Sequence, residues 1–227
     1  DTIAVESPAY FGFLQIIESL GMKALEIQTD PRTGLSVDSL EQALASRVGP
    51  RIRACLLSTT FSNPLGATLP EEAKRRLLRV CREHDVALIE DDIYGDLNFA
   101  GARPLPMKAF DRHGQVMLCS SFSKTLAPGA RIGWVAAGRW SDAVRLRKYT
   151  SSIATPELWQ EALASYLRSN AWGRHLRSLR QSCARQVERF STAIEEAFPP
   201  GTRLSRPEGG FVLWAELPAG CDSLALH

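Results

Sequence analysis

The sequence has little net charge and few of the features that bind metal ions or cross membranes. Its formal net charge is +2, so no overall field favours nucleic acid or an anionic membrane. The four histidines show no metal-ligand spacing, and they are expected to be surface residues. The longest apolar runs are far below the roughly 20 residues that span a bilayer. We therefore expect neither a metal site nor a membrane partner.

The five cysteines are an odd number with no Cys-x-x-Cys spacing. Three of them, Cys55, Cys81 and Cys119, lie within apolar segments. Secreted proteins use cysteines in pairs, whereas reduced thiols persist in a reducing compartment. The pattern indicates buried thiols in a cytoplasmic protein.

Short β-rich runs alternate with longer amphipathic ones along the first two thirds of the chain. The residue pattern predicts strands at 2–7, 24–28, 53–59, 86–92, 115–121 and 132–138, and helices at 10–21, 36–47 and 70–84. Continuous apolar strands separated by helices are typical of an α/β fold, with a mainly parallel sheet covered by helices on both faces. The strand at 132–138 follows a connection too short for a helical crossover, so it is expected to run antiparallel.

The last third of the chain has a different pattern. Residues 139–198 are helical in character, with one break expected near 169–173, and 210–217 alternates like a strand of a second, smaller α+β domain. We divide the chain into a large domain at 1–150, a helical connection at 151–198 and the beginning of the small domain at 199–227. The chain opens directly on a strand and stops as another element starts, which we interpret as a fragment of a longer protein.

Three polar clusters each follow a predicted strand. They are "TTFSN" (59–63), "EDDIY" (90–94) and "SSFSK" (120–124). Ligands of open α/β sheets bind at the carboxyl ends of the strands. The three clusters are therefore expected to meet at one edge of the sheet and to form a site there.

The residue types in these clusters suit a phosphorylated aldehyde. Lys124 can attack a carbonyl once its pKa is lowered, and the fork of Arg131 with the hydroxyl of Ser121 suits a phosphate. Asp91 or Asp92 could cap a helix, form a loop ion pair, act as a base, or neutralise a ligand cation. A metal role is weaker because the clusters supply too few oxygen ligands. Lysine, phosphate ligands and a carboxylate together point to pyridoxal 5′-phosphate.

Four motifs resemble class I/II aminotransferases of fold type I. They are "VESPAYFG", "FSNPLGATLP", "LIEDDIYGDLNF" and "SSFSKTLAPGARIGW", in family order over most of the chain. Together with "RPEGGFVLW", these motifs make the sequence most similar to the aminotransferase-like domain of MocR-type bacterial regulators of the GntR class. Stand-alone aminotransferases acting on aromatic amino acids or 2-aminoadipate share much of it.

The resemblance implies catalytic roles for three residues. Lys124 matches the lysine that bonds to the cofactor aldehyde and later moves a proton from the substrate Cα. Asp91 matches the acid beside the pyridine nitrogen, with Asp92 as the alternative if the alignment slips by one. Tyr94 matches a donor to the ring hydroxyl, a role that Asn63 shares.

The resemblance also implies the rest of the cofactor site. Ser121 and Arg131 match phosphate ligands, and Tyr10 matches an aromatic residue beside the cofactor, although a half-buried tyrosine at a strand end is the plainer interpretation. The phosphate loop and the substrate-carboxylate arginine of the family are expected before residue 1 and after residue 227.

The implied function is transamination between an amino acid and a 2-oxo acid by a homodimer. A different class remains open: a domain that senses the cofactor or its amino-acid adduct in a MocR/GntR-type regulator, contacting DNA only through an upstream domain. A second alternative is another enzyme of this cofactor, such as a C–S lyase or a decarboxylase.

A basic segment, 172–190, holds five arginines. A basic helix can bind nucleic acid, but such a run is more often a solvated face. We favour the solvated face, with an inward stripe made of Leu176, Leu179, Cys183 and Val187.

Overall fold

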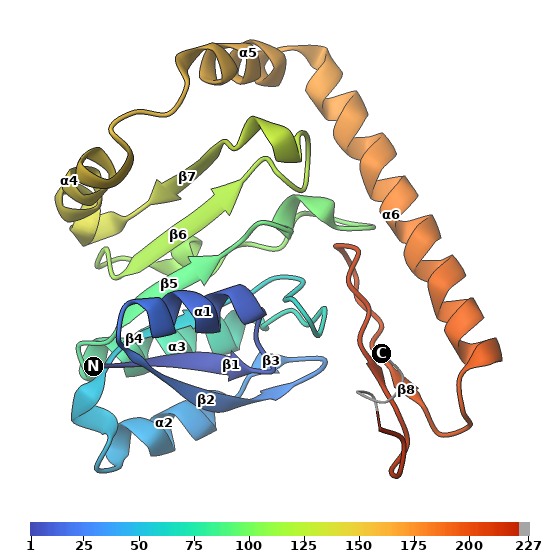
Figure 1. Ribbon diagram of the computed structural model, residues 1–227, viewed down its shortest axis with the longest axis horizontal. Coiled ribbons are helices and arrows are strands. Elements are labelled where there is room, and N and C mark those ends of the chain that lie inside the picture. The colour runs from blue at the N-terminus through green and yellow to red at the C-terminus, as the bar shows by residue number, and fades with distance from the viewer. Residues whose placement is uncertain (223–227) are drawn as a thin grey trace.

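A computed structural model describes residues 1–222 and has a seven-stranded sheet at its centre (Figure 1), in the order β3-β2-β1-β4-β5-β6-β7. The five inner strands, which are mutually parallel, are β1 (Thr2–Ser7), β2 (Lys23–Asp30), β4 (Ile52–Leu57), β5 (Ala87–Asp91) and β6 (Val116–Ser121). The edge strands β3 (Gly34–Leu35) and β7 (Gly133–Ala136) run antiparallel to their neighbours. The predicted parallel sheet and the reversed strand near 132–138 are both confirmed.

Helices cover the sheet on both faces. Helix α1 (Phe11–Ser19) lies on one face, and α2 (Val37–Ala45) and α3 (Glu71–Glu83) lie on the other. Successive side chains of β5 point to opposite faces of the sheet: Leu88 packs with α3, whereas Ile89 packs on the α1 side.

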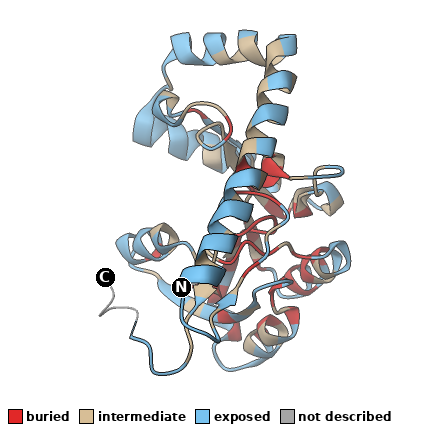
Figure 2. Ribbon diagram, turned by 90° about the vertical axis from the view of Figure 1, so that its right-hand side faces the viewer, coloured by how far each residue is buried: buried red, intermediate tan, exposed pale blue. Residues whose placement is uncertain are grey.

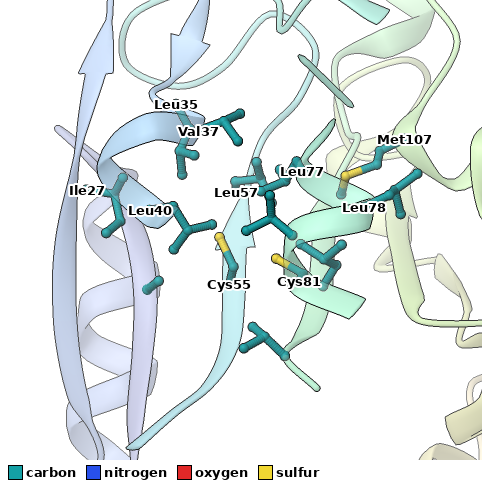
Figure 3. Close-up of a cluster of buried hydrophobic side chains, with 14 of the residues drawn as sticks. Ile27, Leu35, Val37, Leu40, Cys55, Leu57, Leu77, Leu78, Cys81 and Met107 are labelled. Atoms are coloured by element: carbon teal, nitrogen blue, oxygen red, sulfur yellow. The ribbon is translucent and has the colours of Figure 1, made fainter. Parts of the chain in front are cut away.

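The larger core forms between the sheet and the helices α2 and α3. Leu40, Leu77 and Leu88 are completely buried there, and Figure 3 shows the first two facing Cys55 of β4. Burial raises the pKa of the Cys55 thiol well above its usual range, which keeps it protonated and unreactive. All five cysteines are free thiols.

The helical region contains three helices rather than the two expected. They are α4 (Ser141–Ser152), α5 (Glu157–Arg168) and α6 (Asn170–Ala197). The break near 169 is present, where the Ser169 hydroxyl caps α6 by accepting from the Ala171 N–H. The missed break ends α4 at Ile153, whose φ is +56°, and Pro156 then starts α5. Proline lacks an N–H and suits a helix start, a signal that the apolar periodicity obscured.

The expected strand at 210–217 is wrong for most of its length. A two-residue strand β9 (Ala215–Glu216) pairs with β8 (Arg203–Leu204), and the residues before β9 pack against the segments that follow β4 and β5 instead. Leu97 accepts from the Gly210 N–H, and a Cβ on Gly209 would lie 2.3 Å from the Phe61 ring. The Gly-Gly pair thus lets the backbone cross an aromatic ring, a contact that strand alternation does not reveal.

Five short 3₁₀ helices complete the described elements: η1 (Gly49–Arg51), η2 (Gly95–Leu97), η3 (Met107–Phe110), η4 (Pro128–Ala130) and η5 (Gly138–Trp140). Helix α6 runs along one side of the molecule past the ends of the strands (Figure 1), and Figure 2 shows its outer side largely exposed. No helix among residues 1–222 is long and apolar enough to cross a membrane. The same residues contain no cluster of potential metal ligands.

Candidate active site

The three polar clusters meet at the carboxyl edge of the sheet. Strands β4, β5 and β6 are adjacent and parallel, so the residues that follow them emerge side by side. Asp91 and Lys124 come from neighbouring strands and lie close enough for the ammonium to lower the pKa of the carboxyl group. Asn63 lies within hydrogen-bond reach of Tyr94. The structure therefore brings together the cluster residues expected to form a site.

Asp91 and Asp92 have different surroundings. Asp91 lies on the α1 side of β5, where burial and then the neighbouring Asp92 raise its pKa to about 6, against the Ile93 N–H and Lys124. The Asp92 side chain is fully buried on the α3 side and is paired with Arg103. Burial raises its pKa to about 6 as well, although Arg103 opposes this. Asp92 thus has an ion-pair partner within the protein, whereas Asp91 is available to a ligand cation.

Tyr94 is buried and its phenol is hydrogen-bonded to the side chain of Asn63. Burial raises the pKa of Tyr94, the bond to Asn63 opposes this, and Asp91 and Tyr10 raise it further. The phenol therefore stays protonated and can donate to a ligand oxygen. The effect of Tyr10 also places that ring near the same group, at the start of α1.

Tyr10 is 38% exposed, and its ring lies over the first turn of α1. A Cβ on Gly12 would lie 2.5 Å from the Tyr10 ring, so this glycine allows the close approach. The Phe13 ring meets it edge-on with centroids 5.5 Å apart. Tyr10 is thus held beside the edge of the sheet with part of its surface open.

The turn after β6 collects hydroxyl groups and a guanidinium. The Ser123 N–H donates to Ser121 Oγ at 3.4 Å, and Arg131 Nη1 donates to Ser123 Oγ at 3.5 Å and to the Pro128 carbonyl at 3.4 Å. Arg131 is exposed and has a left-handed φ of +53°, which turns the chain back toward Ser123. Lys124, in the same turn, is exposed. An anion held by Ser121 and Arg131 would therefore lie beside the lysine.

Sequence reasoning missed Glu6, a carboxyl group at the end of β1. Its side chain is 4% exposed and accepts a hydrogen bond from the Ser58 N–H at 2.8 Å. Burial raises the pKa of Glu6 to about 8, although the Ser58 bond opposes this, and the charge of Asp91 raises it further. Glu6 is therefore a neutral acid at pH 7, next to the site. A carboxylate at the end of an apolar strand was the available signal.

The basic segment is mostly solvated, as expected, with one exception. Leu176, Leu179 and Cys183 turn inward, and four of the five arginines are exposed. Arg180 is half-buried and donates from Nε to the Asp96 carbonyl at 2.7 Å. His175, expected on the surface, is also half-buried and bonded to the Thr125 carbonyl at 2.8 Å.

The donor set of this edge fits pyridoxal 5′-phosphate. Asp91 lies near the Lys124 amine, and among residues 1–222 no ion pair like that of Asp92 with Arg103 joins Asp91, so its carboxyl group can neutralise a ring cation. Tyr94 and Asn63 offer donors for a ring oxygen, and Ser121 and Arg131 for a phosphate. The fold and this site define an α/β protein of the fold type I, pyridoxal-phosphate-dependent class.

Comparison with known proteins gives the family. The family model for aminotransferase class I and II matches residues 1–225. The chain belongs to the class I and II aminotransferase family, whose cofactor is pyridoxal 5′-phosphate.

Two curated relatives and one solved structure illustrate the similarity. The uncharacterized HTH-type transcriptional regulator YjiR of Escherichia coli is 41% identical over 100% of this chain and 47% of its own length. Aromatic-amino-acid aminotransferase 1 of Thermococcus litoralis is 32% identical over 98% of this chain and 54% of its own. The kynurenine aminotransferase of Pyrococcus horikoshii, solved in complex with PMP, has a TM-score of 0.92 at 30% identity, over 100% of this chain and 56% of its own. The chain thus spans about half the length of the curated relatives it matches.

Proposed function

We propose that the full-length protein is an aminotransferase that exchanges an amino group between an amino acid and a 2-oxo acid. The observation that carries this proposal is the proximity of Lys124 to Asp91 at the carboxyl edge of the sheet, where Asp91 has a raised pKa while Asp92 forms an ion pair with Arg103. Pyridoxal 5′-phosphate, when bound, supplies the electron sink that makes an amino-acid Cα acidic.

Each candidate site residue has a defined role in that proposal. Lys124 would hold the cofactor through its aldehyde with loss of water and, once displaced by the substrate amine, would take the Cα proton and deliver it to the former aldehyde carbon. Asp91 would keep the ring nitrogen protonated by its negative charge. Tyr94 and Asn63 would donate to the ring oxygen. Ser121 and Arg131 would bind the phosphate, and Tyr10 would lie against the ring.

Lys124 carries the decisive test. Borohydride reduction of the full-length protein loaded with the cofactor should fix a pyridoxyl group on the peptide that contains Lys124. The Lys124→Ala protein should show no such label and no transamination, whereas Lys148→Ala, on exposed α4, should retain both. A label on another lysine, found by peptide mass mapping, would refute the assignment.

A second candidate function is that of a regulatory domain sensing the cofactor or its amino-acid adduct. The 41% identity to an HTH-type regulator supports it. Both functions use the same site, so site variants do not separate them. Turnover of amino acid and 2-oxo acid by the full-length protein favours the enzyme. DNA binding that changes with the cofactor, without turnover, favours the regulator, and pyruvate or carbon dioxide release indicates a lyase or decarboxylase.

We also propose that the protein is a homodimer in a cytoplasmic compartment. Exposed apolar side chains on α4, directly after it and on α5 support the dimer; they are Leu146, Tyr149, Ile153, Leu158 and Trp159. The five free thiols are consistent with a reducing compartment.

A further inference from the structure

One face of helix α6 contacts the three segments that follow β4, β5 and β6 and carry most of the candidate site residues. Leu176 and Leu179 pack against a cluster made of Phe61, Tyr94 and Leu97. Phe61 lies two residues before Asn63, and Tyr94 is itself a site residue. The helix therefore packs directly on the segments that follow β4 and β5.

The same face of α6 holds the Lys124 turn on both sides of the lysine. His175 Nε2 lies 2.8 Å from the Thr125 carbonyl oxygen, and because a carbonyl only accepts, Nε2 carries the proton and donates. The ring of Trp172 meets that of Phe122 edge-on, with centroids 6.4 Å apart. Residues before and after Lys124 are thus both attached to α6.

A third contact joins α6 to the segment after β5. Arg180 Nε donates to the Asp96 carbonyl at 2.7 Å, in η2, two residues after Tyr94. His175 and Arg180 lie five residues apart on the inner side of the helix. They bond two backbone carbonyls that belong to different strand ends.

We propose that α6 acts as a clamp that sets the position of Lys124 relative to Asp91 and Tyr94, with His175 and Arg180 as its positioning residues. This inference rests on the proposed function for its chemical consequence. In this proposal neither His175 nor Arg180 touches the reacting atoms. Lys124 and Asp91 stand on separate strand ends, and a displacement near 1 Å between reacting groups costs a large part of the rate.

Amide hydrogen exchange in the cofactor-free, full-length protein tests the clamp without any turnover. The Leu126 and Ala127 amides both donate to the Phe122 carbonyl, so they report opening of the Lys124 turn. The Leu97 amide donates to the Tyr94 carbonyl at 2.8 Å and reports the segment after β5. Amides of β1 serve as the internal reference for global stability.

His175→Ala should accelerate exchange at Leu126 and Ala127 by about tenfold relative to β1, the size expected for one lost hydrogen bond. Arg180→Ala should accelerate Leu97 by a similar factor and leave Leu126 and Ala127 unchanged. His175→Gln keeps an N–H donor and should restore most of the protection. Arg177→Ala, at an exposed arginine of the same helix, is the matched control and should change neither reporter.

Unchanged exchange at the reporters in both alanine variants would overturn the clamp. Equal acceleration at the reporters and in β1 would also overturn it, because the effect would then be a general loss of stability. The His175→Ala protein should also show a shifted pH midpoint of the cofactor absorbance band, which a purely structural role would not move. Borohydride labelling of Lys124 separates the two hypotheses: a labelled Lys124 with unchanged exchange rejects the clamp alone, and a changed exchange pattern without label rejects the proposed chemistry alone.

Discussion

Asp91 and Asp92 show how adjacent, chemically identical residues take different roles. Successive side chains of a strand point to opposite faces, so one carboxyl group faces α1 and the site while the other faces α3 and Arg103. The choice between them follows from the partner each has: Asp92 has a guanidinium, whereas Asp91 has the ammonium of Lys124 nearby and a raised pKa.

Exchange of each aspartate for asparagine tests this division. Asp91→Asn should slow Cα deprotonation by about two to three orders of magnitude, because a positioned charge of this kind contributes roughly 3–4 kcal/mol to the barrier. Asp92→Asn should have a much milder effect on that rate, because Asp92 is paired with Arg103 and not with the ligand cation. Isotope-sensitive rates of the full-length variants measure both effects. Reversed effects would move the ring-nitrogen partner to Asp92.

Glu6 should make stability depend on pH. Its pKa is about 8 in the folded protein against an ordinary value of 4.5, so the folded state holds a proton that the unfolded state releases between those values. The contribution of Glu6 to stability is therefore complete below about pH 4.5 and is lost as the pH rises through about 8. The raised pKa values of Asp91 and Asp92 act with the same sign at lower pH.

Glu6→Gln removes this dependence, because the amide has the shape of the neutral acid and keeps an oxygen for the Ser58 N–H. At pH 8 the variant should be more stable than the parent by on the order of a few kcal/mol, and the difference should shrink toward pH 5. Denaturation midpoints across that range measure it. Glu18→Gln, at the exposed end of α1, serves as the control, and parallel pH profiles for parent and Glu6→Gln would contradict the role of burial.

At the scale of elements, the segment before β9 joins the β8–β9 pair to the candidate site. Phe99 donates to the Glu208 carbonyl, and the Gly209 backbone crosses the Phe61 ring. Phe211 meets Tyr94 edge-on with centroids 5.3 Å apart. This segment therefore buttresses both Phe61 and Tyr94 from outside the sheet.

Gly209→Ala should disturb that contact. The added Cβ would lie 2.3 Å from the Phe61 ring, so either the ring or the segment must shift. We expect a loss of about 1–3 kcal/mol in the free energy of unfolding, as for other overpacked sites, and weaker cofactor binding through Asn63. Gly129→Ala is the control, because a Cβ there meets nothing within 4 Å. Equal midpoints for the two variants in thermal unfolding would argue against a tight contact at Phe61.

At the scale of the whole molecule, the exposed apolar surface of α5 should govern assembly. Leu158 and Trp159 are 79% and 51% exposed, and burial of such side chains against a second copy would favour a dimer. Leu158→Glu with Trp159→Glu in the full-length protein should halve the mass measured by light scattering. Lys23→Glu, an exposed charge change on β2, should leave the mass unchanged. A double variant that keeps the parental mass would exclude this surface from the interface.

The sequence predicted the local elements well where one physical signal dominated. The apolar runs of β4, β5 and β6 fixed these strands, and Pro70 with two glutamates marked the start of α3. It failed where two signals conflicted. The alternation of apolar and polar residues in 210–217 is typical of a strand, but the backbone of the Gly-Gly pair packs against the Phe61 ring, and only Ala215–Glu216 form a strand.

The sequence by itself determined the α/β class and the polar clusters at the strand ends, because each of these depends on neighbours within about ten positions, and its motifs carried the family resemblance that implies the cofactor residues. Tertiary structure alone decided the opposite surroundings of Asp91 and Asp92, the neutral state of Glu6 and the contacts of His175 and Arg180 with the site. These properties arise from burial and from partners 11 to 84 positions away, such as Arg103 for Asp92 and Asp96 for Arg180. Desolvation and long-range hydrogen bonds exist only after the chain has packed, so no local pattern of residues encodes them.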